Sequence, residues 1–123
     1  MDSITPYAIP ENREISEVEW ELIRAMISLE NTIPLEDIDD YKVIGRCGCG
    51  SCPTIFIGHD GDFEKIGKSK GILIDAIGET KNGHSVFATF YLHEAEIIEF
   101  EINYYTGLGE YELPMPSSLN IAK

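Results

Sequence analysis

The chain has 123 residues, 43% of them hydrophobic, so it is long enough to bury a core and too apolar for a disordered segment. It carries 22 acidic and 9 basic residues, a net charge of −13. This excess excludes a nucleic-acid binder, which needs a basic surface, and disfavours binding to anionic lipids; the expected macromolecular partner is basic.

The first strong local signal predicts a helix from Glu17 to Glu30, after an extended, proline-containing lead. Ser16 and Glu19 have the S-x-x-E spacing of a capping box, and Ile15 and Trp20 stand where a hydrophobic staple places its two residues. A helical wheel leaves only a narrow polar stripe. The helix is therefore expected to be largely buried.

After the helix, the hydrophobic pattern changes to a period of two, which is typical of strands. The predicted strands are Lys42–Cys47, Thr54–Ile57, Ile72–Ile77, His84–Leu92 and Glu96–Tyr105. Asn82 and Gly83 predict a type I′ hairpin turn, in which both central residues need positive φ. The expected fold class is α+β, with one N-terminal amphipathic helix packed on a mainly antiparallel sheet of about five strands.

The last predicted strand separates its residues by face. Ile98, Phe100 and Ile102 alternate with Glu99 and Glu101. This alternation predicts a strand with its apolar side chains inward and its acidic side chains outward, on a sheet whose second face is wet.

The acidity is concentrated at the two ends of the chain, since residues 1–40 hold 11 acidic and 2 basic residues and residues 82–123 hold 6 and 1. Carboxylates on a rigid scaffold attract a basic partner and occupy the place of phosphates. The alternative is a solvated surface that keeps the protein soluble. The predicted partner-binding residues form two groups, Glu96, Glu99 and Glu101 on the last strand, and Glu36, Asp37, Asp39 and Asp40 after the helix.

Three clustered cysteines, Cys47, Cys49 and Cys52, are a candidate ligand set for zinc, with a histidine as the fourth ligand. The alternative is that these small side chains pack beside the sheet while the adjacent glycines let the chain turn. The histidines are expected to be ordinary surface or turn residues. The chain contains no Walker loop, H-E-x-x-H or G-x-S-x-G motif, so we expect no enzymatic activity and no cofactor.

The compartment follows from what the sequence lacks. No apolar run approaches the roughly 18 residues that span a bilayer. The N-terminus lacks the basic and apolar regions of a secretory signal, and an odd, clustered set of cysteines is not a disulfide framework. A single cytoplasmic domain over residues 1–123 is expected, with no membrane contact.

The run from Val43 to Ile55 resembles a group of small bacterial proteins that carry C-x-C-G-C-P, then Ser or Thr, then Val or Ile. The ending resembles them too, with its Ile-Glu-Phe-Glu stretch and Leu113-Pro114-Met115-Pro116, so the resemblance covers about residues 14 to 119. Ser51 interrupts the group's pattern, and the cysteine geometry is therefore not carried over.

In size, acidity and lack of a catalytic motif, the chain also resembles the immunity proteins of polymorphic toxin and contact-dependent growth inhibition systems. This resemblance implies a protein that binds and neutralises a cognate toxin domain. A basic nuclease is the expected toxin, because its active site must be positive to bind its own substrate. The alternative function is a zinc-binding module built on the clustered cysteines.

Overall fold

The computed structural model describes residues 7–30, 38–48, 53–66, 70–93, 96–104 and 112–121. Its elements in chain order are β1 (Ala8–Arg13), α1 (Glu17–Glu30), β2 (Lys42–Cys47), β3 (Ile55–Gly58), the 3₁₀ turn η2 (Phe63–Lys65), β4 (Lys70–Glu79), β5 (Ser85–His93), β6 (Ile98–Tyr104), the 3₁₀ turn η4 (Pro116–Ser118) and β7 (Asn120–Ile121). The described strands form one antiparallel sheet in the order β1-β2-β3-β6-β5-β4-β7. The predicted α+β class is confirmed.

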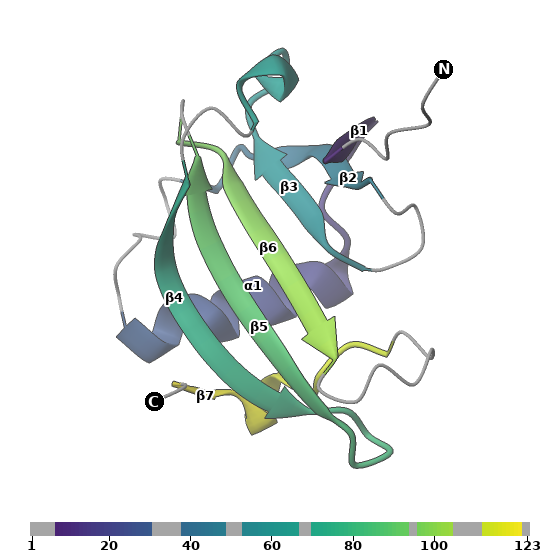
Figure 1. The fold of residues 1–123 in the computed structure, drawn as a ribbon, viewed down its shortest axis with the longest axis vertical. Coiled ribbons are helices and arrows are strands. Elements are labelled where there is room, and N and C mark those ends of the chain that lie inside the picture. Colours follow the sequence, from purple (N-terminus) through teal and green to yellow (C-terminus); the bar gives the residue numbers. More distant parts are fainter. Residues whose placement is uncertain are drawn as a thin grey trace.

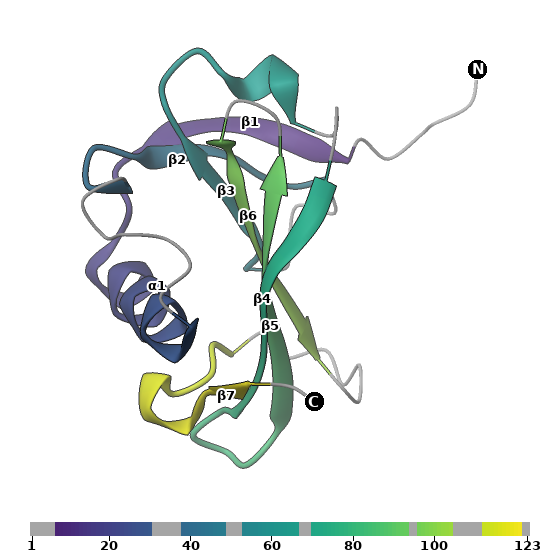
Figure 2. The ribbon, with the colours of Figure 1, turned by 90° about the vertical axis from the view of Figure 1, so that its left-hand side faces the viewer.

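The sheet is twisted, and α1 lies across one of its faces. In Figure 1 the long strands β4, β5 and β6 run in front of the helix. In the view turned by 90°, β1 and β2 cross the upper end of these strands, and α1 lies to their left (Figure 2). Within the described part of the chain, no α-helix covers the opposite side of β4–β6.

The main core lies between α1 and the sheet, and the helix has the bounds that the sequence predicts. Its buried side chains are Leu22, Ile23, Met26 and Ile27. They join one cluster with buried strand residues that include Val43, Ile57, Ile74, Ala88, Phe90 and Phe100. These side chains alternate along the strands, so the residues between them point to the other face of the sheet.

The start of α1 confirms the predicted capping box. The Glu19 N–H donates to Ser16 Oγ at 3.2 Å, and the Ser16 N–H donates to Glu19 Oε1 at 2.9 Å. These reciprocal bonds satisfy N–H groups that have no partner within the helix. Ile15 is buried in the main core and Trp20 packs against that core.

A second, smaller cluster contradicts the expectation that the other face of the sheet is wet throughout. Ile44, Phe56 and Ile97 are buried together, and Ala8 and Ile66 pack against them. Phe56 alternates with Ile55 and Ile57 of the main core, so this cluster lies on the face away from α1. The β1–β2–β3 end of that face is therefore covered.

Three details differ from the sequence-based expectations. The sheet gains β1 in the expected extended lead and β7 in the expected irregular tail. The turn between β4 and β5 is also a three-residue loop, closed by a bond from the Thr80 N–H to His84 O at 2.9 Å. Only Gly83 of this loop has positive φ, at 85°, so the type I′ prediction was wrong. Thr80 Oγ1 accepts N–H bonds from Asn82 and His84, which stabilises the wider loop.

No helix in the described ranges is long and apolar enough to cross a membrane.

Candidate functional site

The side of β4, β5 and β6 that points away from α1, here called the outer face, carries a row of polar residues across three strands. Thr89 pairs with Asp75 on one side and with Glu101 on the other. The Thr89 hydroxyl donates to Asp75 Oδ1 at 2.8 Å, which orients that carboxylate. Both acidic residues are half-buried, and no cation in the described ranges forms an ion pair with either of them.

The rest of the outer face combines aromatic and polar side chains. Phe87 and Tyr91 flank Thr89 along β5 and are half-buried, while Asn103 on β6 is exposed. Neither β5 nor β6 contains a lysine or an arginine. Aromatic residues are enriched at protein interfaces, and carboxylates between them give such a surface a preference for cationic groups.

Glu99 is where the structure contradicts the expected acidic stripe. The alternation is correct, because Ile98, Phe100 and Ile102 face the main core. Glu99, however, is only 3% exposed and does not face solvent. Its cross-strand neighbours are Phe56 on β3 and Tyr91 on β5. Tyr7 and the second cluster cover this end of the outer face, which the pattern of β6 alone does not reveal.

Tyr7 and His93 are among the hydrogen-bond partners of the buried Glu99 carboxylate. The Tyr7 hydroxyl donates to Glu99 Oε1, and His93 Nε2 lies 2.9 Å from the same oxygen. Tyr7 and His93 both pack their rings against Phe56. His93 ends strand β5 and is only 2% exposed, so the expectation of an ordinary surface or turn residue was wrong for it.

Burial and the hydrogen bond to Glu99 raise the pKa of Tyr7 well above its usual range, with further contributions from the charges of Glu99 and Glu101. The phenol therefore stays protonated and remains a donor. A buried carboxylate is costly unless it is hydrogen-bonded, so the Tyr7–Glu99–His93 cluster supports the fold beneath the outer face.

The other predicted carboxylates lie at one end of the sheet. Asp39, Asp40 and Glu96 are all exposed. The Tyr41 hydroxyl donates to the backbone oxygen of Glu96 at 2.8 Å, and the Tyr41 ring packs edge-on against His59. His59 Nε2 in turn lies 3.4 Å from Asp40 Oδ1.

Tyr41 thus connects the turn before β2 with the turn before β6, although 55 residues separate Tyr41 from Glu96. We call Asp39, Asp40 and Glu96 the end cluster. Glu96 also has a φ of 62°, a left-handed conformation that is uncommon for a residue other than glycine. Glu36 and Asp37, which were predicted to belong to the same surface, lie outside the described residues.

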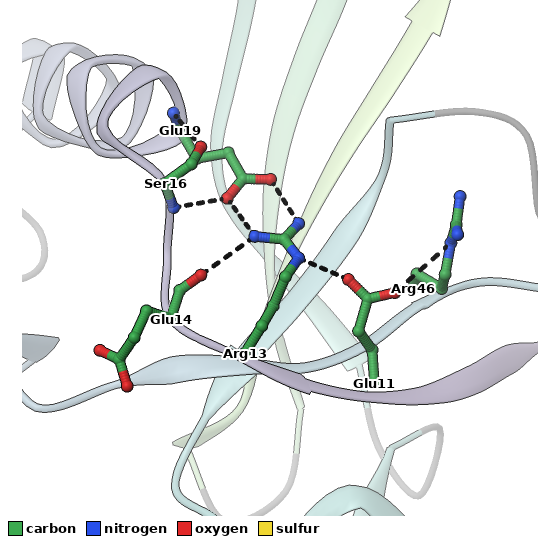
Figure 3. Close-up of polar contacts among 6 residues, drawn as sticks. All are labelled: Glu11, Arg13, Glu14, Ser16, Glu19 and Arg46. Carbon is green, nitrogen blue, oxygen red and sulfur yellow. Dashed lines mark hydrogen bonds and ion pairs between the residues drawn. The ribbon is translucent and has the colours of Figure 1, made fainter.

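A charged network at the start of α1 was not predicted (Figure 3). Arg13 donates to both carboxylate oxygens of Glu19 at 2.9 and 2.8 Å, and its Nε donates to Glu11 at 2.6 Å. It also donates to the backbone oxygen of Glu14 at 3.0 Å. The same Glu19 forms the capping box, so Arg13 ties the end of β1 to the first turn of the helix.

The pKa values follow this geometry. The hydrogen bond to Glu19 raises the pKa of Arg13 further above its already high value, against the opposing effect of burial. Burial alone would raise the pKa of Glu19, but the bonds from Arg13 and Ser16 outweigh it and hold the pKa below its usual range.

A half-open pocket of about 310 Å³ adjoins this network, lined by Glu11, Arg13, Glu19, Arg46, Pro53, Thr54, Ile55 and Leu113. Arg13 donates hydrogen bonds to Glu11, Glu14 and Glu19, and Arg46 Nε lies 3.8 Å from Glu11 Oε1. Because the charges of the lining are balanced within the chain, the pocket has a structural part in joining β1, β2 and α1.

The cysteine cluster lies mostly outside the described residues. Cys47 ends β2 and is half-buried, whereas Cys49 and Cys52 are not described. The described ranges contain no group of three or more His, Cys, Asp and Glu side chains placed to hold a metal ion. Zinc binding by the three thiols stays a prediction.

Sequence reasoning missed Asp75, Tyr7 and His93. Asp75 carries a visible signal, because it is the one polar residue in the apolar run from Ile72 to Ile77. Its place beside Thr89 and Glu101 depends on the register of three strands. Comparisons with family models, with curated proteins and with solved structures found no match to this chain.

Proposed function

We propose that this protein is an immunity protein, which binds a cognate bacterial toxin domain in the cytoplasm and neutralises it by steric and electrostatic occlusion. The toxin domain is basic, and a nuclease is the activity that fits best. The proposal is carried by the row Asp75–Thr89–Glu101, in which two carboxylates lie on one face of the sheet and no cation of the described residues forms an ion pair with either.

The mechanism follows from electrostatic complementarity. A nuclease presents a positive cleft to the phosphates of its substrate, and rigid carboxylates can occupy that cleft without being cleaved. Asp75 is already oriented by Thr89, so little side-chain freedom is lost on binding. Phe87 and Tyr91 add apolar contact area beside the acidic row.

The predicted binding residues have different parts in this proposal. Glu101 contacts the partner together with Asp75. The end cluster of Asp39, Asp40 and Glu96 attracts the basic partner over a longer range. Glu99 is bonded to Tyr7 and His93 and holds these side chains in place. It is buried in the free protein, so it does not contact the partner directly.

The test uses the toxin domain encoded by the gene next to this one, purified as a catalytically inactive variant. We expect nanomolar binding that weakens as salt rises, and protection of cells that express the active toxin. Glu101→Lys is expected to weaken binding at least tenfold. Glu21→Lys on the exposed side of α1 changes the net charge equally and serves as the matched control.

Absence of binding and of protection would overturn the proposed function. Equal losses of affinity for Glu101→Lys and Glu21→Lys would exclude the outer face as the binding surface, because only the net charge would then matter.

A further inference from the structure

The edge of β4 that faces away from β5 is unpaired over half of its length in the described chain. On this side β4 pairs with β7, but only through Ala76 and Ile77. Residues 70–75, here called the free edge, pair with β5 on one side and have no described strand on the other. Such an edge presents N–H and C=O groups that can pair with another strand.

The free edge is also apolar and open. Ile72 is 62% exposed, more than any other exposed large hydrophobic residue in the described ranges. Gly71 beside it is exposed, and a Cβ placed there would have no atom within 4 Å. Leu92 lies opposite Gly71 on β5 and is 38% exposed. The opposite edge of the sheet differs, because Pro10 in β1 removes a donor there.

The register places Ile72 and Asp75 on the same face. Ile72 pairs with Tyr91 and Asp75 pairs with Thr89. A bulge between Ile72 and Ile74 accommodates the one extra residue that β4 has over this stretch. Tyr91 and Thr89 are two positions apart on β5 and share the outer face. The most exposed apolar side chain of the free edge and its acidic residue therefore point the same way.

We propose that the free edge pairs with the free edge of a second copy of this chain, antiparallel and about a two-fold axis at Ile72. This arrangement is self-complementary, as a two-fold interface requires. It sets Ile72 against Ile72 of the second copy. It also brings the acidic end of each segment, at Asp75, to the start of the other, where the sequence has Lys70.

The two copies carry −13 each, so their long-range repulsion opposes the pairing. Salt screens that repulsion over about 10 Å at 0.1 M and over shorter distances at higher concentration. The dimer is therefore expected to become tighter as salt rises, which is the opposite of the salt dependence expected for the basic partner.

The experiment is sedimentation velocity of the full chain over a range of protein concentrations, at low and at high salt. We expect a concentration-dependent species of twice 13.8 kDa that is favoured at high salt. Ile72→Lys is expected to weaken the dimer at least tenfold. Val18→Lys, on α1 and 54% exposed, is the matched control and is expected to leave it intact.

A second variant locates the axis. Ile72→Cys is expected to form a disulfide between two copies under mild oxidation, identified as a 72–72 linked peptide by mass spectrometry, whereas Val18→Cys is not. A mass of 13.8 kDa at every concentration and salt would overturn the proposal, as would a dimer that survives Ile72→Lys or lacks the 72–72 link. Asp75 belongs to both surfaces, but toxin binding is tested at Glu101 on β6, outside the free edge, so failure of the dimer and failure of toxin binding are distinguishable.

Discussion

Tyr7→Phe tests the role assigned to the buried Glu99 carboxylate. The substitution removes one hydroxyl and keeps the ring that packs against Phe56. Glu99 then loses the Tyr7 donor and keeps His93 Nε2 at 2.9 Å. Because Glu99 is only 3% exposed, water replaces the lost donor poorly.

The expected cost follows from the exposure of the two partners. A hydrogen bond to a charged group contributes about 1.5–3 kcal/mol. Tyr7 is 49% exposed, so solvent screening reduces this to about 1–2 kcal/mol. For a chain of this length, that corresponds to a fall in Tm of roughly 4–8 °C.

The assay is urea unfolding of the wild type, Tyr7→Phe, Glu99→Gln and the double variant, followed by circular dichroism. We expect the two single effects to be non-additive by about 1 kcal/mol, because the residues are in direct contact. Additive effects, or a Tyr7→Phe variant as stable as the wild type, would contradict the reasoning.

The same variant has a pH signature. Burial and Glu99 raise the pKa of Tyr7 above its ordinary value of about 10, so the protonated phenol is favoured in the folded state. Its contribution to stability is complete below pH 10 and is lost as the pH rises further. The stability difference between the wild type and Tyr7→Phe is therefore expected to shrink above pH 10, and a constant difference would contradict this assignment.

Two further predictions concern the helix start and the sheet. Glu19→Gln is expected to cost about 1–2 kcal/mol at pH 7, since it weakens both the capping box and the pair with Arg13. The pKa of Glu19 is lowered, so its contribution is present above about pH 4.5 and lost below it; urea midpoints at pH 7 and pH 3 should show the difference shrinking, and an equal difference at both would refute the cause. Gly78→Ala is expected to cost about 1–3 kcal/mol in thermal melts, because its Cβ would lie 2.9 Å from Leu119 Cδ2. Gly71→Ala, with nothing within 4 Å, should stay within about 0.5 kcal/mol, and equal costs for both glycines would refute the steric account.

Local patterns were sufficient for most of the secondary structure. The helix has its predicted bounds at Glu17 and Glu30, and its capping box forms as the S-x-x-E spacing indicates. The strand at Lys42–Cys47 has its predicted bounds as well. These elements depend on side-chain periodicity and on neighbours three or four residues away, which are visible along the chain.

The short edge strands were harder to predict. β7 has two residues, and β1 contains Pro10, so neither shows a periodic pattern. Both exist because a neighbouring strand offers backbone partners, β2 to β1 and β4 to β7. The conformation of the loop at Asn82 also depends on a side-chain contact that the Asn-Gly pair does not reveal. The Thr80 hydroxyl accepts N–H bonds from Asn82 and His84.

The sequence by itself determined the sign and size of the charge, the α+β class and the alternation of acidic and apolar residues on β6. The tertiary structure decided which acidic residues reach solvent. Glu99 and Glu101 occupy equivalent positions in the alternation, yet Tyr7, 92 residues away from Glu99, covers only the first of them. The register of three strands places Asp75 and Glu101 in one row, on either side of Thr89. Periodicity assigns a side chain to one face of a sheet, but only the packing of distant segments determines whether that face is open.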